Sequence, residues 1–338
     1  MLKEKTVTIQ DLARAANVST ASVSRVLNKS DKVSTKVRQR VLQAVDSMNY
    51  IPNSAARALA SQSTMTIGAV VPTLENPGFA IGVEALQKKL AEKDYTLFVA
   101  SSNYDLGQEK RQVEKLVTRG VDGIMLVGSL HGNGLIDYLR RRNVPFVETW
   151  VLSTNAGVSA VGFNNREAST RITDYLLNLG HVHFGVIGGV TKTNDRARER
   201  IKGIKQTLNK RGLKLGRESL LERPFSIVDG QLAMRSLLAV RPRPTAVICG
   251  NDILAFGALL ECQKQAIAVP ENVSVVGFDD LDFAASLIPS LTTIRVPADE
   301  IGSAAAETLL AEIAGKTDHA NTKLDVDLIV RKSTGPPP

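Results

Sequence analysis

Three short stretches carry residue types that enzymes and metal sites use. Residues 185–193 read GVIGGVTKT, but Thr191 stands where a phosphate-binding loop needs a glycine directly before its lysine. His181 and His183 have no acid or cysteine nearby at metal-ligand spacing, which favours a strand-edge position. The acids of 279–282 lack the glycine and spacing of a calcium loop. No nucleophile–base pair stands out either. The sequence therefore predicts a binding protein that is no enzyme and needs no cofactor or metal.

A second group of residues has chemistry suited to nucleic acid. Small side chains and one arginine lie close together near the N-terminus, at Thr20, Ala21, Ser22 and Arg25. A guanidinium can make a bidentate contact with a guanine edge, and a methyl group can contact a thymine methyl. A purely structural three-helix bundle is the alternative interpretation, but it leaves these side chains without a role.

Capping signals predict the helices that would carry this group. Thr8 with an acid three residues later predicts a helix start, and an apolar stripe follows through residue 16. Asn17 suits a tight turn, and Ser19 can cap a second helix. A third helix is expected from Ser34 to a stop before Pro52. Residues 1–49 are therefore predicted to form an all-α helix-turn-helix domain, with residues 20–25 near the start and on the outer face of its second helix.

The charge distribution separates this head from the rest of the chain. Of the net charge of +8 over 338 residues, +6 falls within residues 1–61 and +2 on the remainder. A basic head on a nearly neutral body is typical of a phosphate-binding module attached to another domain, although a solvated basic end is the alternative. No apolar run approaches the ~18 residues of a membrane span, and no secretory h-region follows the N-terminus, so we expect a cytoplasmic protein. Cys249 and Cys262 are expected to be free thiols.

From residue 65 onward, β-rich runs alternate with helical stretches. The runs are TIGAVVP, YTLFVAS, DGIMLVG, VPFVETW, HFGVIGG, TAVICG and VSVVGFD. Repeated strand–helix units predict parallel sheets with helices on both faces. The length exceeds one such sheet, so we expect an α/β core of two lobes, similar to sugar-binding periplasmic proteins, with a ligand between the lobes at the carboxyl ends of the strands.

The head also shows an ordered set of motifs: TIQDLARAANVSTASVSRVLN at 8–28, VS at 33–34, NYIPN at 49–53 and AARALAS at 55–61. On these motifs the chain resembles the lactose-repressor (LacI/GalR) family of transcriptional regulators along nearly its whole length. The resemblance implies a head at 1–49, a hinge helix and linker at 50–64, and an effector-binding, dimerising core at 65–338. Its N-lobe is expected at about 65–162 plus 293–322, and its C-lobe at about 163–292 plus 323–338.

The resemblance also implies roles for residues of the head. The base-reading positions fall on Thr20, Ala21, Ser22 and Arg25. Phosphate contacts, which position the head without reading sequence, fall on Thr8, Ser19, Ser24, Asn28, Ser34 and Asn53. Serine at position 22 replaces the commoner threonine of the motif and loses a methyl contact.

The hinge is expected to enter the minor groove. A helix this short is marginal alone in water, so a flexible tether is the alternative in the absence of DNA. The resemblance implies that it orders on operator DNA and inserts Leu59 as an apolar wedge, with Ala56 and Arg57 beside it.

For the core, the resemblance implies a small-molecule effector. The corresponding positions are Phe79, Trp150, Phe163, Arg196, Arg200, Phe225, Asn251 and Asp279. Without the resemblance, core packing would explain the phenylalanines, and a solvated helix face would explain Arg200. Two arginines suit a carboxylate, and VGFNN, FVE and ECQ resemble stretches of gluconate-utilisation repressors in this family.

The sequence therefore predicts a DNA-binding transcriptional regulator, a repressor whose affinity for operator DNA is controlled by a sugar or a sugar acid such as gluconate. A homodimer is expected, and a tetramer stays open. The alternatives are a sugar-binding protein without a transcriptional role, as in transporters, and a sugar-modifying enzyme. Whether the effector induces or corepresses cannot be read from the residues.

Overall fold

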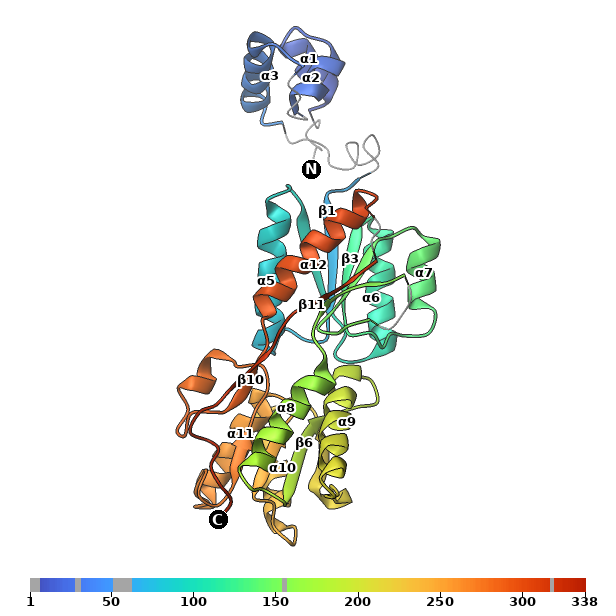
Figure 1. Ribbon diagram of the computed structural model, residues 1–338. Coiled ribbons are helices and arrows are strands. Elements are labelled where there is room, and N and C mark those ends of the chain that lie inside the picture. Colours follow the sequence, from blue (N-terminus) through green and yellow to red (C-terminus); the bar gives the residue numbers. More distant parts are fainter. Residues whose placement is uncertain (1–6, 28–31, 51–62, 154–156, 317–318) are drawn as a thin grey trace, which may run out of the picture. The chain divides into compact units, whose positions relative to one another are not determined.

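The computed structural model describes residues 7–27, 32–50, 63–153, 157–316 and 319–338 (Figure 1). Contacts group the chain into two units, residues 1–64 and 65–338. No helix among the described residues is long and apolar enough to cross a bilayer.

Within its described residues, the head contains three short helices around one small core. They are α1 (Ile9–Ala15), α2 (Thr20–Leu27) and α3 (Thr35–Ser47). Leu12, Val23 and Val41, one from each helix, have no exposed surface. The predicted capping box of α1 is present, since the Thr8 side chain accepts from the Asp11 amide and the Asp11 carboxylate accepts from the Thr8 amide. The expected helix-turn-helix architecture is confirmed.

The N-lobe of the core is built on a six-stranded parallel sheet, counted over the described residues, in the order β11-β5-β4-β3-β1-β2. Its strands are β1 (Thr66–Val71), β2 (Thr96–Ser101), β3 (Gly123–Val127), β4 (Phe146–Thr149), β5 (Ser159–Gly162) and β11 (Asn321–Lys323). Its helices are α5 (Pro77–Ala91), α6 (Leu106–Thr118), α7 (Leu135–Arg141) and α12 (Ala298–Ile313). Apolar residues on both faces of the strands explain this layering, since α5 and α12 cover one face and α6 and α7 the other.

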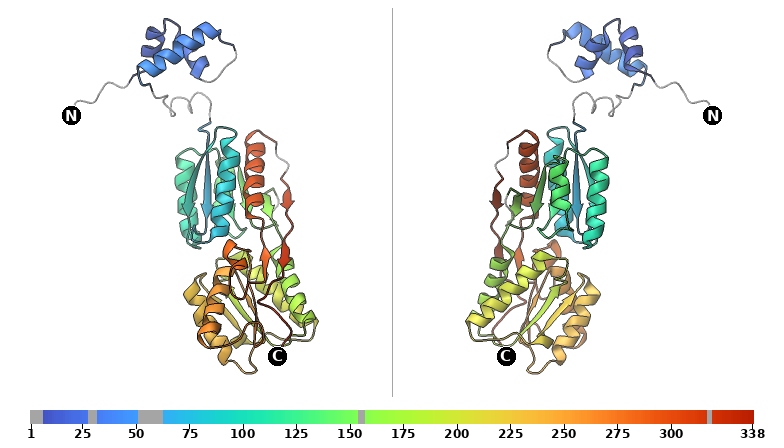
Figure 2. Two further views of the ribbon diagram at one scale, coloured as in Figure 1. Left: turned by 90° about the vertical axis from the view of Figure 1, so that its left-hand side faces the viewer. Right: turned by 90° about the vertical axis from the view of Figure 1, so that its right-hand side faces the viewer.

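The C-lobe repeats the same plan on four parallel strands, again among the described residues, in the order β7-β6-β8-β9. These are β6 (Phe184–Gly189), β7 (Leu220–Arg223), β8 (Ala246–Cys249) and β9 (Ser274–Val276). The helices are α8 (Asn165–Asn178), α9 (Asp195–Lys210), α10 (Ile227–Ala239) and α11 (Asp252–Lys264), with short 3-10 turns at Arg217–Ser219 and Asp282–Ala285. Figure 2 shows helices on both faces of each sheet. The predicted fold of a helix-turn-helix head with a two-lobed α/β core is confirmed.

Two further strands, β10 (Thr293–Arg295) and β12 (Asp327–Ile329), pair antiparallel where the chain passes between the lobes. Cys249 and Cys262 are buried free thiols in the C-lobe core. Because the strands are parallel within each lobe, their carboxyl ends share one edge, where the following helices begin.

Candidate functional site

The base-reading candidates of the head lie on α2. The helix buries Val23 and Val26 against the head's core and leaves Thr20, Ala21 and Arg25 exposed. Ser22 is partly buried, and its hydroxyl lies 3.0 Å from that of Ser19. A helix that projects small side chains and one arginine is suited to the major groove.

The phosphate candidates among the described residues differ in whether their side chains are exposed and already hydrogen-bonded. The Thr8 hydroxyl is engaged with Asp11 at 2.7 Å. Ser34 precedes α3, is exposed and makes no side-chain cap hydrogen bond. Ser24 is partly buried. The other residues predicted for phosphate and minor-groove contacts lie outside the described residues: Asn28, Asn53, Ala56, Arg57 and Leu59.

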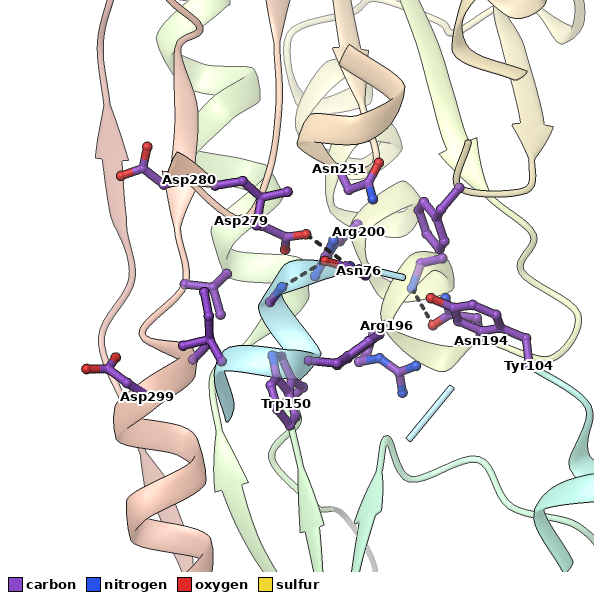
Figure 3. Close-up of a pocket in the computed structure, with 18 residues that line it drawn as sticks. Asn76, Tyr104, Trp150, Asn194, Arg196, Arg200, Asn251, Asp279, Asp280 and Asp299 are labelled. Carbon is purple, nitrogen blue, oxygen red and sulfur yellow. Dashed lines mark hydrogen bonds between the residues drawn. The ribbon is translucent and has the colours of Figure 1, made fainter. Parts of the chain in front are cut away.

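The second candidate site is a cavity of about 130 Å³ between the two lobes of the core (Figure 3). A cavity of about 150 Å³ holds a benzene ring, so this space suits a single ring-sized ligand. Its lining comes from both lobes: Asn76, Gly78, Phe79, Ile81, Tyr104, Trp150, Asn194, Arg196, Ala197, Arg200, Phe225, Asn251, Asp279, Asp280, Leu281, Val296, Ala298 and Asp299.

Three helix N-termini converge on this cavity, each capped by an asparagine. Asn76 caps α5, Asn194 caps α9 and Asn251 caps α11, and each side-chain oxygen accepts from a backbone amide of the first turn. Parallel topology produces this convergence, because each helix starts just after the carboxyl end of a strand. The positive ends of three helix dipoles thus face the cavity and favour a ligand with negative charge.

Arg200 is held firmly in the cavity floor. Its Nε donates to Asn165 at 2.8 Å, and its Nη1 donates to the Gly250 carbonyl at 2.7 Å. The guanidinium stacks 3.5 Å from the centre of the Phe278 ring. Burial lowers the pKa of Arg200 to about 10, so it is a cation at neutral pH. Asn165 also donates to the Trp150 carbonyl at 2.9 Å, which links Arg200 to the aromatic wall.

Two carboxylates lie beside Arg200, the partly buried Asp279 and the fully buried Asp252. Burial raises the pKa of Asp279 to about 6, against the opposing effects of Arg200, a 3.4 Å hydrogen bond from Asn76, and Arg196. Burial, reinforced by the charge of Asp279, raises the pKa of Asp252 to about 8. At neutral pH the carboxylate that lines the cavity, Asp279, is therefore mostly ionised, whereas Asp252 is mostly protonated.

One donor in the wall lacks a partner. Asn251 is 1% exposed, and its Oδ1 accepts from the Leu254 amide in the cap of α11. Its Nδ2 has no hydrogen-bond partner among the described residues. A buried amide donor without a partner costs free energy. A ligand oxygen in the cavity would supply the missing acceptor.

Aromatic rings form another part of the wall, and two of them stand on backbone with positive φ. Phe79 contacts Trp150 edge-on at 5.2 Å, and Tyr104 contacts Phe225 at 5.7 Å between ring centres. Tyr104, Trp150 and Asp279 have φ values of 59°, 59° and 115°. Such backbone is costly for residues other than glycine and gathers at binding sites.

The structure brings together seven of the eight residues predicted for effector binding, and the lining holds eleven more, among them Asn76, Tyr104 and Asn194. Phe163 does not line the cavity; it is 1% exposed and stacks on Phe278 at 6.0 Å. Sequence reasoning missed Asn76, Tyr104 and Asn194, although all three follow strand ends. That position was a signal that could have found them.

Two of the three enzyme-like stretches make hydrogen bonds within the C-lobe, and the third, residues 279–282, contributes to the lining of the cavity. His181 is buried and contacts the Thr245 hydroxyl and the Gly335 carbonyl, both at 2.9 Å. The backbone amide and the hydroxyl of Thr191 donate hydrogen bonds to the Glu222 carboxylate. Among the described residues, no group of His, Cys, Asp and Glu has the geometry to hold a metal ion.

Comparison with known proteins shows the family to which the chain belongs. Residues 8–53 match the family model "Bacterial regulatory proteins, lacI family", and residues 173–334 match a periplasmic binding protein-like domain. The chain is 32% identical to the HTH-type transcriptional repressor PurR of Pasteurella multocida over 96% of this chain and 98% of that one. The chain belongs to the lacI family. It is thus a DNA-binding transcriptional regulator of the repressor type, and its relatives are repressors rather than enzymes.

Another relative and two solved structures are also similar to this chain along nearly its whole length. The ribose operon repressor of Haemophilus influenzae is 32% identical over 96% of this chain and 98% of that one. The Lac repressor dimer bound to operator and the anti-inducer ONPF superimposes with a TM-score of 0.87 at 28% identity, over 98% of this chain and all of that one. A CelR–cellobiose complex gives a TM-score of 0.70 at 28% identity, over 97% and 99%.

Proposed function

We propose that this regulator is a homodimeric repressor whose operator affinity is set by one small sugar acid, such as gluconate, bound in the cavity between the lobes. The observation that supports the effector part of the proposal is a buried hydrogen-bond donor without a partner in a cavity that aromatic rings line. The Asn251 amide lacks a partner among the described residues, and Arg196 presents a guanidinium there.

The choice of an acid over a neutral sugar rests on the helix termini. The charged side chains of the lining are offset by neighbours: Arg196 is paired with Asp195, and Arg200 lies beside Asp279. Asp280 is paired with Arg295 and Arg331, and Asp299 is exposed at the rim. Three helix N-termini then tip the cavity toward an anion. A neutral sugar is the second candidate, because Asp279 can accept hydroxyl hydrogens and because relatives include a ribose operon repressor and a regulator solved with cellobiose.

For DNA binding, we propose that Arg25 reads a guanine, that Thr20, Ala21 and Ser22 contact neighbouring bases, and that Leu59 acts as the minor-groove wedge. The exposure of Thr20, Ala21 and Arg25 on α2 supports the first part. Operator DNA lies in the cytoplasm, which is where we place the protein.

For the dimer, we propose that exposed apolar side chains of both lobes form the interface. In the N-lobe, Phe98 and Val99 lie on β2, an edge strand, and are 39% and 40% exposed. In the C-lobe, Val228 and Leu232 of α10 are 62% and 48% exposed. Neighbouring apolar groups that form a contiguous exposed patch mark protein–protein contact sites. The solved Lac repressor relative is a dimer. Sedimentation velocity would separate monomer, dimer and tetramer.

Titration calorimetry with gluconate, a phosphorylated sugar and a neutral hexose tests the effector class. We expect gluconate to bind most tightly. A clear preference for the neutral hexose would reject the sugar acid as the effector, but it would not affect the assignment of the protein as a transcriptional regulator. Binding of none of the three would reject the effector class as a whole.

A further inference from the structure

One carboxylate joins the effector cavity to the opposite lobe. Asp195 is the first residue of α9 in the C-lobe, and its Oδ2 accepts from the backbone amide of Ser129 at 2.7 Å and from the Ser129 hydroxyl at 2.9 Å. Ser129 follows β3 in the N-lobe. The other oxygen, Oδ1, accepts from Nη1 of Arg196 at 3.0 Å. Asp195 and Arg196 are each 6% exposed, so this bridge is shielded from water.

The N-lobe is shaped to receive this bridge. Gly128, next to Ser129, has a φ of +89°, and a Cβ added there would lie 2.0 Å from Nη1 of Arg196 and 2.6 Å from Oδ1 of Asp195. Only glycine permits both the backbone conformation and the close approach. The fit indicates a built contact between the lobes.

The same N-lobe loop is anchored from behind. His131, two residues after Ser129, has one ring nitrogen 3.1 Å from Glu109 of α6 and the other 3.5 Å from Glu148 of β4, and both carboxylates are buried. Burial disfavours the imidazolium, but the two carboxylates outweigh it and raise the pKa of His131 to about 9. The charged His131, held between Glu109 of α6 and Glu148 of β4, therefore keeps the loop of residues 128–131 in place.

We propose that Asp195 is a positioning residue that couples effector binding to closure of the two lobes. The inference rests on the proposed function, because it takes Arg196 as a contact of the effector. A ligand carboxylate on the free edge of the Arg196 guanidinium fixes that side chain with Nη1 on Asp195, and Asp195 in turn holds Ser129. The effector therefore favours the arrangement in which the start of α9 is bonded to the loop of residues 128–131.

An acid in the first turn of a helix can also act through the helix dipole alone. The side-chain chemistry separates the two roles. A carboxylate offers two acceptor oxygens, one for Arg196 and one for the Ser129 amide. An asparagine offers one acceptor oxygen and an NH2 group, so one of these two N–H donors faces another donor. Asp229, in the first turn of α10, provides a matched control, since its carboxylate contacts Ser226 of its own cap and does not line the effector cavity.

The experiment compares full-length wild type, Asp195→Ala, Asp195→Asn and Asp229→Ala. Hydrogen exchange of the peptide that contains residues 128–131 reports the Ser129 amide without any effector. Quenching of Trp150, the sole tryptophan of the chain, reports binding of gluconate, a phosphorylated sugar and a neutral hexose. Fluorescence anisotropy on an operator selected from random DNA reports the response to the bound probe.

For Asp195→Ala we expect about tenfold faster exchange of this peptide and about tenfold weaker binding of the probe, the scale of one charge-assisted hydrogen bond. The effector-induced change in operator affinity should shrink in parallel. Asp195→Asn should fall between Asp195→Ala and wild type, and Asp229→Ala should behave as wild type.

Equal behaviour of Asp195→Ala and Asp229→Ala would overturn the inference. So would faster exchange of the loop with an unchanged effector response, because the contact would then be structural only. If wild type binds none of the three probes, the proposed function itself fails and the coupling role falls with it; the exchange result still shows whether the bridge exists.

Discussion

The head and the core present their functional side chains in opposite ways. In the head, Thr20, Ala21 and Arg25 stand exposed on one short helix. In the core, the cavity is assembled from strand ends and helix starts spread over both lobes, and Asn251 and Arg196 are almost fully buried. A duplex is a large partner that can meet an exposed surface, whereas a small ligand must be enclosed to lose its water. The two functions should therefore be separable by mutation.

The largest separation is expected for Arg200→Ala. The change removes the guanidinium that holds Asn165 and the Gly250 carbonyl, so the cavity floor loses two hydrogen bonds and its cation. We expect no measurable effector response, with operator affinity in the absence of effector close to that of wild type. Trp150 quenching and operator anisotropy measure the two quantities. Arg200→Lys, which keeps the charge but not the planar fork, should retain part of the binding. A large loss of operator affinity without effector would break the comparison.

The reverse separation is expected for Arg25→Ala. Loss of a bidentate base contact should cost roughly 1–3 kcal/mol on operator DNA and relax the preference at one guanine per half-site. Effector binding should not change. Lys36→Ala, an exposed cation at the start of α3, should instead weaken binding to all sequences alike if it faces phosphate. Equal losses on operator and random DNA for Arg25→Ala would rule out base reading.

The difference between a site on one helix and a site assembled from distant segments explains how much the sequence could predict. The head depends on local signals, so the capping box of Thr8 and Asp11 and the exposed face of α2 follow from neighbours in the chain. The order of strands and helices in the core is likewise periodic. The cavity depends on contacts between distant segments and on backbone with positive φ. The position of Tyr104 after a strand end indicates the edge of the sheet where it lies, but not that its ring lines the cavity. Phe163 was assigned to the cavity from resemblance, but it stacks on Phe278 outside the lining.

A smaller effect is expected from the hinge. Leu59→Ala should leave effector binding intact and reduce both operator affinity and DNA bending, because only the proposed apolar wedge is removed. A circular-permutation gel shift measures the bend. An unchanged bend would refute the assignment of Leu59.

The smallest effect concerns the stability of the core as a function of pH. His131 has its pKa raised to about 9, so the stability that its ion pairs contribute is full below its ordinary value and is lost as the pH rises through about 9. The pKa of Asp252 is raised to about 8, so its protonated form is favoured in the folded state. The free energy of unfolding therefore also decreases as the pH rises toward 8. The melting temperature followed by Trp150 fluorescence should fall by a few degrees between pH 6.5 and 9. A His131→Gln variant should show a flatter profile, and a rising melting temperature over this range would contradict the assignment.

Operator affinity measured with and without saturating effector tests the link between the two regions most directly. Anisotropy of a labelled, selected operator would be recorded for wild type and Arg200→Ala, with saturation verified by Trp150 quenching. We expect the wild-type affinity to change by roughly 5- to 150-fold, the usual range of allosteric coupling, and the Arg200→Ala affinity to stay constant. An unchanged wild-type affinity with the cavity demonstrably occupied would contradict control of DNA binding by the effector.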